Sequence, residues 1–268
     1  MKHPPSQIIT LTTDFGTRDS YVATMKGVIY QICRAATVVD LTHQIHPQDL
    51  TEASLVLESC YRFFPAGTIH VVVVDPGVGT RRRAILVDTP EHIFIGPDNG
   101  VFSRIYSSQA PCEVREIVRE EFLMPEISDT FHGRDIFCPV AARLAQGVHP
   151  SEVGPIVVDP VRRDPPQPIA WQEQLTGEVI HVDSFGNIIT NISREVFESI
   201  TRGRRFRIVT NGKMIDRLSR TYQDVPPGKA LALFGSLDML EIATHGGRAD
   251  RQIGAGKGDP VQVLTDPL

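Results

Sequence analysis

Carboxylates that close apolar segments are the first residues in this chain that could do chemistry. Three of them directly follow strand-like runs: Asp14 after ITLTT, Asp40 after TVV and Asp75 after HVVVV. Ligands of open α/β sheets bind outside the carboxyl ends of strands, so a site would form at these positions. Asp14 and Asp75 also precede glycines, which let a ligand approach the backbone. For Asp40, a role limited to capping a turn stays open.

A basic loop follows Asp75 and reads PGVGTRRR over residues 76–83. It has neither the third glycine of a dinucleotide-binding fingerprint nor the lysine of a phosphate-binding loop. Either the arginines form a solvated rim, or one of them is held by Asp75 in a shared pocket. His132 lies between a polar loop and a helix-like segment. A structural histidine would fit there too, but the adjacent Gly133 and the helix start favour a catalytic role.

Two further polar motifs are most simply explained as tight turns. They are Asp98-Asn99-Gly100 and the segment 183–187, which reads DSFGN.

The elements that must position these residues alternate between strand and helix patterns in the first part of the chain. This alternation predicts an α/β domain with a largely parallel sheet flanked by helices. The unbroken apolar run before Asp75 is typical of a strand buried on both faces. The expected strands cover residues 8–13, 37–41 and 68–74, and the expected helices cover residues 20–33, 49–64 and 136–146.

Residues 159–168 hold four prolines in ten positions and predict a linker between two domains. We therefore expect an α/β domain over residues 1–165 and a second domain over residues 172–268. Short strand patterns separated by turns predict that the second domain is an all-β barrel or sandwich. These patterns cover residues 175–183, 187–192, 205–209, 229–234, 239–243 and 260–264.

Composition excludes several classes of protein. The chain has 268 residues, 41% hydrophobic and 22% charged, with a formal charge of −5, which is globular and disfavours a nucleic-acid partner. Cys33, Cys60, Cys112 and Cys138 form no CxxC pair, so free thiols in a reducing compartment are expected. No signal-peptide-like apolar segment and no run of about 20 apolar residues is present, which predicts a soluble, cytoplasmic protein without a membrane partner.

Seven segments, taken in order, resemble one known family that spans nearly the whole chain. They are similar to the S-adenosylmethionine hydroxide adenosyltransferases (adenosine-forming SAM hydrolases), relatives of fluorinase and chlorinase. The resemblance implies that water or hydroxide attacks C5′ of S-adenosyl-L-methionine and releases adenosine and L-methionine, with no cofactor and no metal. The segments are LTTDFGTRDSYVATMKG, VVDLTHQI, VVVVDPGVGTRRRAI, GPDNGVFS, TFHGRDIF, VDSFGNIITNI and FGSLDMLEIA.

The same resemblance implies roles for individual residues. The family's catalytic triad, which the halogenases lack, corresponds to Asp75, Arg82 and His132. Members form homotrimers whose active sites lie between subunits, with the barrel of one subunit contributing to its neighbour's site. Leu237 and residues 244–246 depart from the family pattern and leave contacts of the last barrel loop open. The substrate-binding residues implied are Asp14, Asp19 and Ser20 from the α/β domain, and Asp183, Asn187 and Ser236 from the neighbouring barrel.

For the mechanism, we expect Arg82 and His132 to orient a water molecule while Asp75 fixes Arg82. Neutral His132 is the expected proton acceptor, and Asp75 is the alternative. Two other functions remain open. Asp14, Asp40, Asp75 and His132 could ligate Mg²⁺ or Mn²⁺ in a metal-dependent phosphohydrolase. The pocket could also belong to a non-catalytic nucleoside-binding protein.

Overall fold

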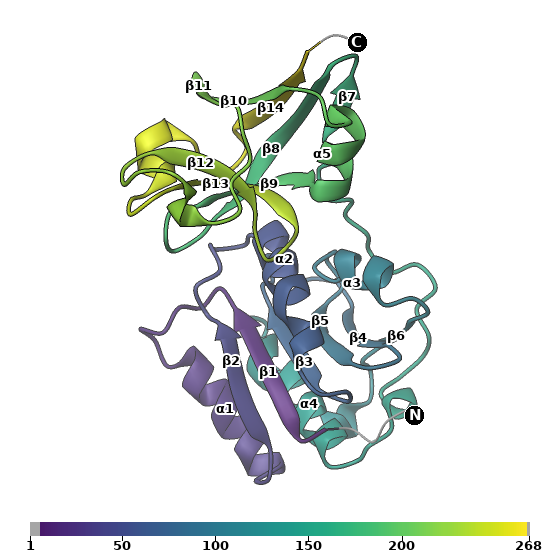
Figure 1. The fold of residues 1–268 in the computed structure, drawn as a ribbon. Coiled ribbons are helices and arrows are strands. Elements are labelled where there is room, and N and C mark those ends of the chain that lie inside the picture. Colours follow the sequence, from purple (N-terminus) through teal and green to yellow (C-terminus); the bar gives the residue numbers. More distant parts are fainter. Residues whose placement is uncertain (1–5, 267–268) are drawn as a thin grey trace. The chain divides into compact units, whose positions relative to one another are not determined.

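A computed structural model describes residues 6–266, and the chain divides into two compact units, residues 1–164 and 165–268 (Figure 1). The boundary lies within the proline-rich segment 159–168. Each unit has its own sheet and its own buried core.

The first unit is built on a six-stranded sheet with the order β2-β1-β3-β5-β4-β6. Its strands are β1 (Ile8–Thr13), β2 (Thr37–Thr42), β3 (Ile69–Val73), β4 (Ala84–Asp88), β5 (Ile93–Pro97) and β6 (Glu113–Glu116). Its helices are α1 (Tyr21–Ile32), α2 (Leu50–Cys60), α3 (Ser103–Ser108) and α4 (Cys138–Ala145), with 3₁₀ turns at Tyr61–Phe63, Glu120–Phe122 and Pro150–Glu152 and a π-helical turn, η3, at Gly133–Phe137.

The expected largely parallel sheet needs one correction, because this sheet is mixed. Strands β2, β1, β3 and β5 pair in parallel, whereas β4 is antiparallel to both of its neighbours, β5 and β6. Only residues 89–92 connect β4 to β5. A parallel crossover needs about a dozen residues or more, so a connection this short allows only a hairpin.

Strand β3 is buried on both faces, which explains its unbroken apolar sequence. Val71 and Val73 pack into a core shared with α1 and α4, while Val72 and Val74 pack into a core shared with α2 and α3. The sheet therefore lies between two helical layers, and the site loops leave it at the carboxyl end of its central strands.

The second unit contains an all-antiparallel sheet of eight strands, as the all-β prediction required. The segment just after one end strand reaches the other end strand through an isolated bridge between Leu218 and Ala232, so that the sheet is nearly closed. One helix, α5 (Arg194–Thr201), was not predicted. The strands are β7 (Ile169–Trp171), β8 (Gln174–Val182), β9 (Ile188–Ser193), β10 (Phe206–Thr210), β11 (Lys213–Ile215), β12 (Ala230–Phe234), β13 (Met239–Thr244) and β14 (Pro260–Thr265), with short helical turns at Tyr222–Asp224 and Asp250–Gly254.

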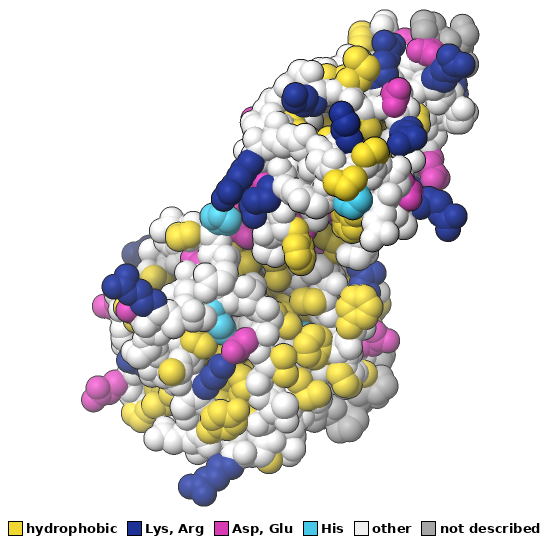
Figure 2. All heavy atoms as spheres, turned by 60° about the vertical axis from the view of Figure 1, so that its left-hand side comes forward, with side chains coloured by type: hydrophobic (Ala, Val, Ile, Leu, Met, Phe, Trp, Pro, Cys, Tyr) yellow, Lys and Arg dark blue, Asp and Glu magenta, His cyan; other side chains and the backbone are white. Residues whose placement is uncertain are grey.

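Within residues 6–266, no helix has the length and apolar character that crossing a membrane would require. On the face shown in Figure 2, Lys and Arg side chains are interspersed with Asp and Glu in each unit.

Candidate active site

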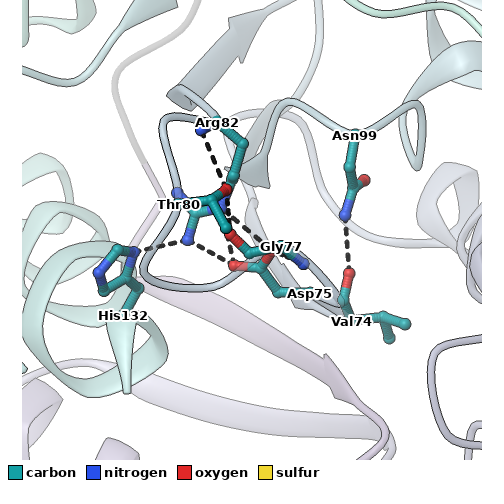
Figure 3. A network of polar contacts seen from close by, with 7 residues as sticks. All are labelled: Val74, Asp75, Gly77, Thr80, Arg82, Asn99 and His132. Atoms are coloured by element: carbon teal, nitrogen blue, oxygen red, sulfur yellow. Dashed lines mark hydrogen bonds and ion pairs between the residues drawn. The ribbon is translucent and has the colours of Figure 1, made fainter. Parts of the chain in front are cut away.

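Asp75 and Arg82 form a buried ion pair at the carboxyl end of β3. The Nε atom of Arg82 donates hydrogen bonds to Oδ1 and Oδ2 of Asp75 at 3.0 and 2.9 Å, and its Nη2 atom also donates to Oδ2 (Figure 3). The two side chains are only 5% and 10% exposed, respectively. The guanidinium carbon also lies 5.4 Å from the ring centre of Phe137. Charge pairing and packing together fix the guanidinium in one position.

His132 completes a connected network of three side chains. Its Nδ1 atom lies 2.6 Å from Nη2 of Arg82 (Figure 3). A guanidinium has donors only, so Nδ1 of His132 must accept this bond and the proton of the neutral ring must sit on Nε2. Burial, and secondarily the charge of Arg82, lower the pKa of His132 below its usual 6.5. The ring is therefore neutral near pH 7, with Nε2–H as its available donor.

The loop that carries Arg82 packs backbone to backbone against the segment that precedes His132. Gly79 has a φ of +74°, and a Cβ at this position would lie 2.3 Å from the carbonyl oxygen of Asp129. Only glycine permits both this conformation and this approach. Gly133 is similarly confined, because its Cβ would lie 3.3 Å from Val73 and from Met25. It opens the π-helical turn η3, a feature found frequently at functional sites.

The Asp98-Asn99-Gly100 segment does more than turn the chain. Asn99 donates from Nδ2 to the carbonyl of Val74 at 2.9 Å, which holds the peptide just before Asp75 (Figure 3). The buried Asp98 accepts from Nε of Arg83 at 2.8 Å. The turn therefore supports both ends of the loop that holds the ion pair. Sequence reasoning missed this role, because the motif is equally typical of any tight turn.

Asp14 follows the strand next to the one that precedes Asp75. Strands β1 and β3 are parallel neighbours, with Thr13 paired to Val73, so both carboxylates follow adjacent strand ends. Asp14 is half-buried and accepts from the backbone N–H of Gln48 at 2.8 Å. Asp19 and Ser20 are exposed at the start of α1.

Asp40 lies within β2 and does not end it, so its expected place at a strand end is wrong. It binds Lys26 at 2.6 Å and His43 at 3.0 Å, so its oxygens are occupied by partners of its own.

Nowhere in residues 6–266 are three or more His, Cys, Asp or Glu side chains grouped as a metal site would need.

In the second unit, the three predicted substrate-binding residues meet at one pocket of about 680 Å³. Two polar residues of this pocket, Tyr222 and Glu241, were missed. Glu241 lies within a segment whose apolar residues predicted a strand, and a lone acid within it was the only available signal. The pocket is lined by Asp183, Phe185, Asn187, Ile189, Tyr222, Gly235, Ser236, Leu237, Met239, Glu241, Thr244, Gly246 and Gly247.

The class of protein is defined by an α/β unit with a connected acid–guanidinium–imidazole network and an all-β unit with a pocket that holds two acids. Residues 9–154 match the SAM hydroxide adenosyltransferase N-terminal domain, and residues 177–262 match the C-terminal domain of the same family. The chain therefore belongs to the SAM hydroxide adenosyltransferase family, and the resemblance seen in its sequence is confirmed.

Relatives of the chain include both SAM hydrolases and fluorinases. The chain is 36% identical over 260 residues to the (R)-S-adenosyl-L-methionine hydrolase of Salinispora arenicola, covering 96% of this chain and 97% of that protein. It is 30% identical over 231 residues to the fluorinase of Actinopolyspora mzabensis, covering 75% and 77%. The crystal structure of a conserved protein from Thermotoga maritima matches with a TM-score of 0.89 and 35% identity, covering 96% of this chain and 99% of that one.

Proposed function

We propose that this protein is an enzyme that hydrolyses S-adenosyl-L-methionine to adenosine and L-methionine. The observation that carries the proposal is the connected network of Asp75, Arg82 and His132 at the carboxyl end of β3, in a chain whose relatives include named (R)-S-adenosyl-L-methionine hydrolases. In the reaction, the oxygen of water or hydroxide forms a bond to C5′ while the C5′–S bond breaks, and its electron pair stays on sulfur.

The leaving group needs no help from an acid. Sulfur is cationic in the substrate and neutral in methionine, so bond cleavage removes a charge rather than creating one. The protein must instead hold the oxygen nucleophile in line with the C–S bond, and fixed positioning of this kind is a large source of rate enhancement.

Orientation of the nucleophile falls to Arg82 and His132. Because Nδ1 of His132 already accepts from Arg82, the ring is a donor at Nε2, not the proton acceptor that we expected from the sequence. Two donors that converge on a water oxygen fix its orientation and favour its hydroxide form. If neutral water attacks, the protonated alcohol that results is strongly acidic and gives its proton to solvent. Asp75 keeps Arg82 in place.

Substrate binding is assigned to the predicted residues of both units. Asp14 holds the ribose hydroxyls, and Asp19 and Ser20 hold the methionine side. Asn187 contacts adenine, while Asp183 and Ser236 contact the methionine end. No metal or cofactor takes part in the proposed reaction.

We also propose that the enzyme is a homotrimer whose active sites are shared between subunits. Light scattering of the purified protein tests the trimer. A mixture of His132→Ala and Asn187→Ala chains, refolded together, tests the sharing, because only mixed trimers can then contain an intact site. A monomeric active enzyme would contradict this assembly.

The function is tested by incubating the purified protein with S-adenosyl-L-methionine in ¹⁸O-labelled water, with and without EDTA. We expect adenosine that carries the label at its 5′ oxygen, in both conditions. Loss of activity in EDTA would favour a metal-dependent hydrolase, and substrate recovered intact would favour a nucleoside-binding protein. Alanine at Asp75, Arg82 or His132 should abolish most of the turnover. Asp40→Asn, which changes a carboxylate of the neighbouring sheet strand β2 outside the network, is the matched control.

A further inference from the structure

Glu241 is a nearly buried acid on β13 that faces the pocket of the second unit. Its side chain belongs to a residue only 6% exposed, and it lines the pocket together with Ile189 and Met239. Tyr222 donates from its hydroxyl to Oε1 of Glu241 at 2.8 Å. A charged residue is rarely kept this deep in a strand unless it has a partner or a ligand.

The second oxygen of Glu241, Oε2, accepts no hydrogen bond from residues 6–266, and the residue lines the pocket. Oε2 lies against the backbone of Gly235, where a Cβ would be 2.4 Å away, so that any larger residue would displace the carboxylate. Within residues 6–266, the hydrogen bond from Tyr222 is the one that Glu241 accepts. The pocket thus contains a carboxylate that is fixed at one oxygen and available at the other.

Asp183, the other acid of the pocket, is already engaged within its own turn. Its Oδ1 atom accepts from the backbone N–H groups of Phe185 and Asn187 at 2.9 and 2.8 Å. Its Oδ2 atom accepts from Nδ2 of Asn187 at 2.9 Å. Asp183 therefore shapes the turn that presents Asn187 and shares both of its oxygens with that turn, whereas only one oxygen of Glu241 has a hydrogen-bond partner among the described residues.

The charge of the pocket favours a cationic group. Among its described lining residues there are two acids, Asp183 and Glu241, and no Lys, Arg or His. Burial raises the pKa of Glu241, and the nearby charge of Asp183 raises it further. An arriving cation relieves both effects, because it supplies the missing opposite charge.

We propose that Glu241 binds the α-ammonium group at the amino-acid end of the substrate, with Tyr222 as the positioning residue that fixes its carboxylate. The inference rests on the proposed function for the identity of the substrate. The amino-acid end of the substrate carries an ammonium beside a carboxylate. Its binding site therefore needs a hydrogen-bond acceptor beside a hydrogen-bond donor. Glu241 supplies the acceptor, and the hydroxyl of Ser236, next to Gly235, supplies a donor.

The test compares two ligands that are not hydrolysed and differ only in the amino group. They are S-adenosyl-L-homocysteine and its analogue without the α-amino group, titrated calorimetrically into the intact protein. Both lack the sulfonium charge, so the comparison isolates the ammonium. The wild type should bind the amino ligand about tenfold or more tightly than the analogue, as a charge-assisted hydrogen bond predicts.

Glu241→Gln keeps the size of the side chain and removes its charge, and it should reduce this preference to about twofold or less. Tyr222→Phe should reduce the preference for the amino ligand by less than Glu241→Gln does. Asp238→Asn removes an acid from the same hairpin, outside the pocket and paired with Arg194, and should keep the wild-type preference. Circular dichroism checks that each variant is folded.

The inference is overturned if Glu241→Gln retains the wild-type preference, or if the wild type does not distinguish or bind the two ligands. These titrations do not depend on turnover. A protein that prefers the amino ligand but releases no adenosine would refute the proposed function and leave the assignment of Glu241 standing.

Discussion

Arg82 donates a hydrogen bond to Nδ1 of His132 over 2.6 Å, and this contact decides which ring nitrogen carries the proton. A protonated His132 would present an N–H to the guanidinium, so the two donors would face each other and the two positive charges would repel. The network is therefore compatible only with the neutral ring. Two predictions about activity rest on this relationship.

The first prediction concerns the acidic side of the pH–rate profile. Burial and Arg82 lower the pKa of His132, so the ring stays neutral as the pH falls through its usual value of 6.5. Activity should fall only below that pH, where protonation breaks the contact with Arg82. The measurement is kcat/KM for adenosine release across the acidic range. A half-maximal point at or above 6.5 would contradict a neutral, Arg82-bound His132.

The second prediction separates guanidinium geometry from charge. Arg82→Lys keeps the positive charge but cannot contact both Asp75 and His132 in the same plane. We expect kcat to fall by about a hundredfold, nearly as far as in Arg82→Ala. The exposed neighbour Arg81 offers the matched control, because Arg81→Lys should leave kcat within about twofold. Near-normal turnover by Arg82→Lys would show that charge alone suffices.

Much of the scaffold could be predicted from local sequence. The strand before Asp75 was evident because a strand buried on both faces needs apolar residues at every position. The antiparallel β4 was not predicted, because strand direction depends on a hairpin of four residues and not on side-chain pattern. Helix α5 was missed for a related reason. Its apolar residues Val196, Phe197 and Ile200 do have helical spacing, but a helix of eight residues is too short for that spacing to be told apart from a loop.

Some residues of the candidate site could likewise be identified from the sequence, and others could not. Asp75 and Asp14 were identifiable because strand ends are recognisable in a sequence, and His132 because it lies beside a glycine at a helix start. The family resemblance then selected Arg82 from the three arginines of its loop. The contact of Asn99 with Val74 joins residues 25 positions apart, and no local pattern predicts it. Glu241 was hidden for a similar reason: its partner Tyr222 lies 19 positions away, in the helical turn Tyr222–Asp224.

The third prediction tests the glycine that joins the two site loops. In Gly79→Ala, the new Cβ would lie 2.3 Å from the carbonyl oxygen of Asp129 in a backbone with a φ of +74°. We expect a loss of about 1–3 kcal/mol in the free energy of unfolding, together with a clear loss of kcat, because Arg82 and His132 are displaced relative to each other. Urea unfolding and adenosine release measure the two effects.

Gly212→Ala is the control for backbone strain alone. Gly212 has a nearly identical φ of +73°, but no atom lies within 4 Å of its Cβ position. This variant should lose about 1 kcal/mol and retain full activity. Gly79→Ala and Gly212→Ala could instead lose the same free energy of unfolding and both retain activity. The packing of Gly79 on Asp129 would then contribute nothing to stability or activity beyond the backbone conformation.

The fourth prediction concerns stability in acid and a buried histidine away from the site. His70, on β3, contacts Thr10 at 2.8 Å and His92 at 3.4 Å and stacks on Phe94. Burial, with a smaller contribution from His92, lowers its pKa to about 3. The unfolded chain takes up a proton near pH 6.5, whereas the folded chain does not until about pH 3. Stability is therefore lost as the pH falls through this window, by up to about 1.4 kcal/mol per pH unit.

His70→Gln keeps a hydrogen-bonding group for Thr10 and removes the titration. Between about pH 7 and about pH 5, its free energy of unfolding should change by about 2 kcal/mol less than that of the wild type. The variant is expected to be less stable than the wild type near pH 7, because it loses the ring stacked on Phe94, and the gap should narrow in acid. Urea unfolding of both proteins across this range measures the effect. Parallel pH dependences would mean that His70 does not set the acid limit of the fold.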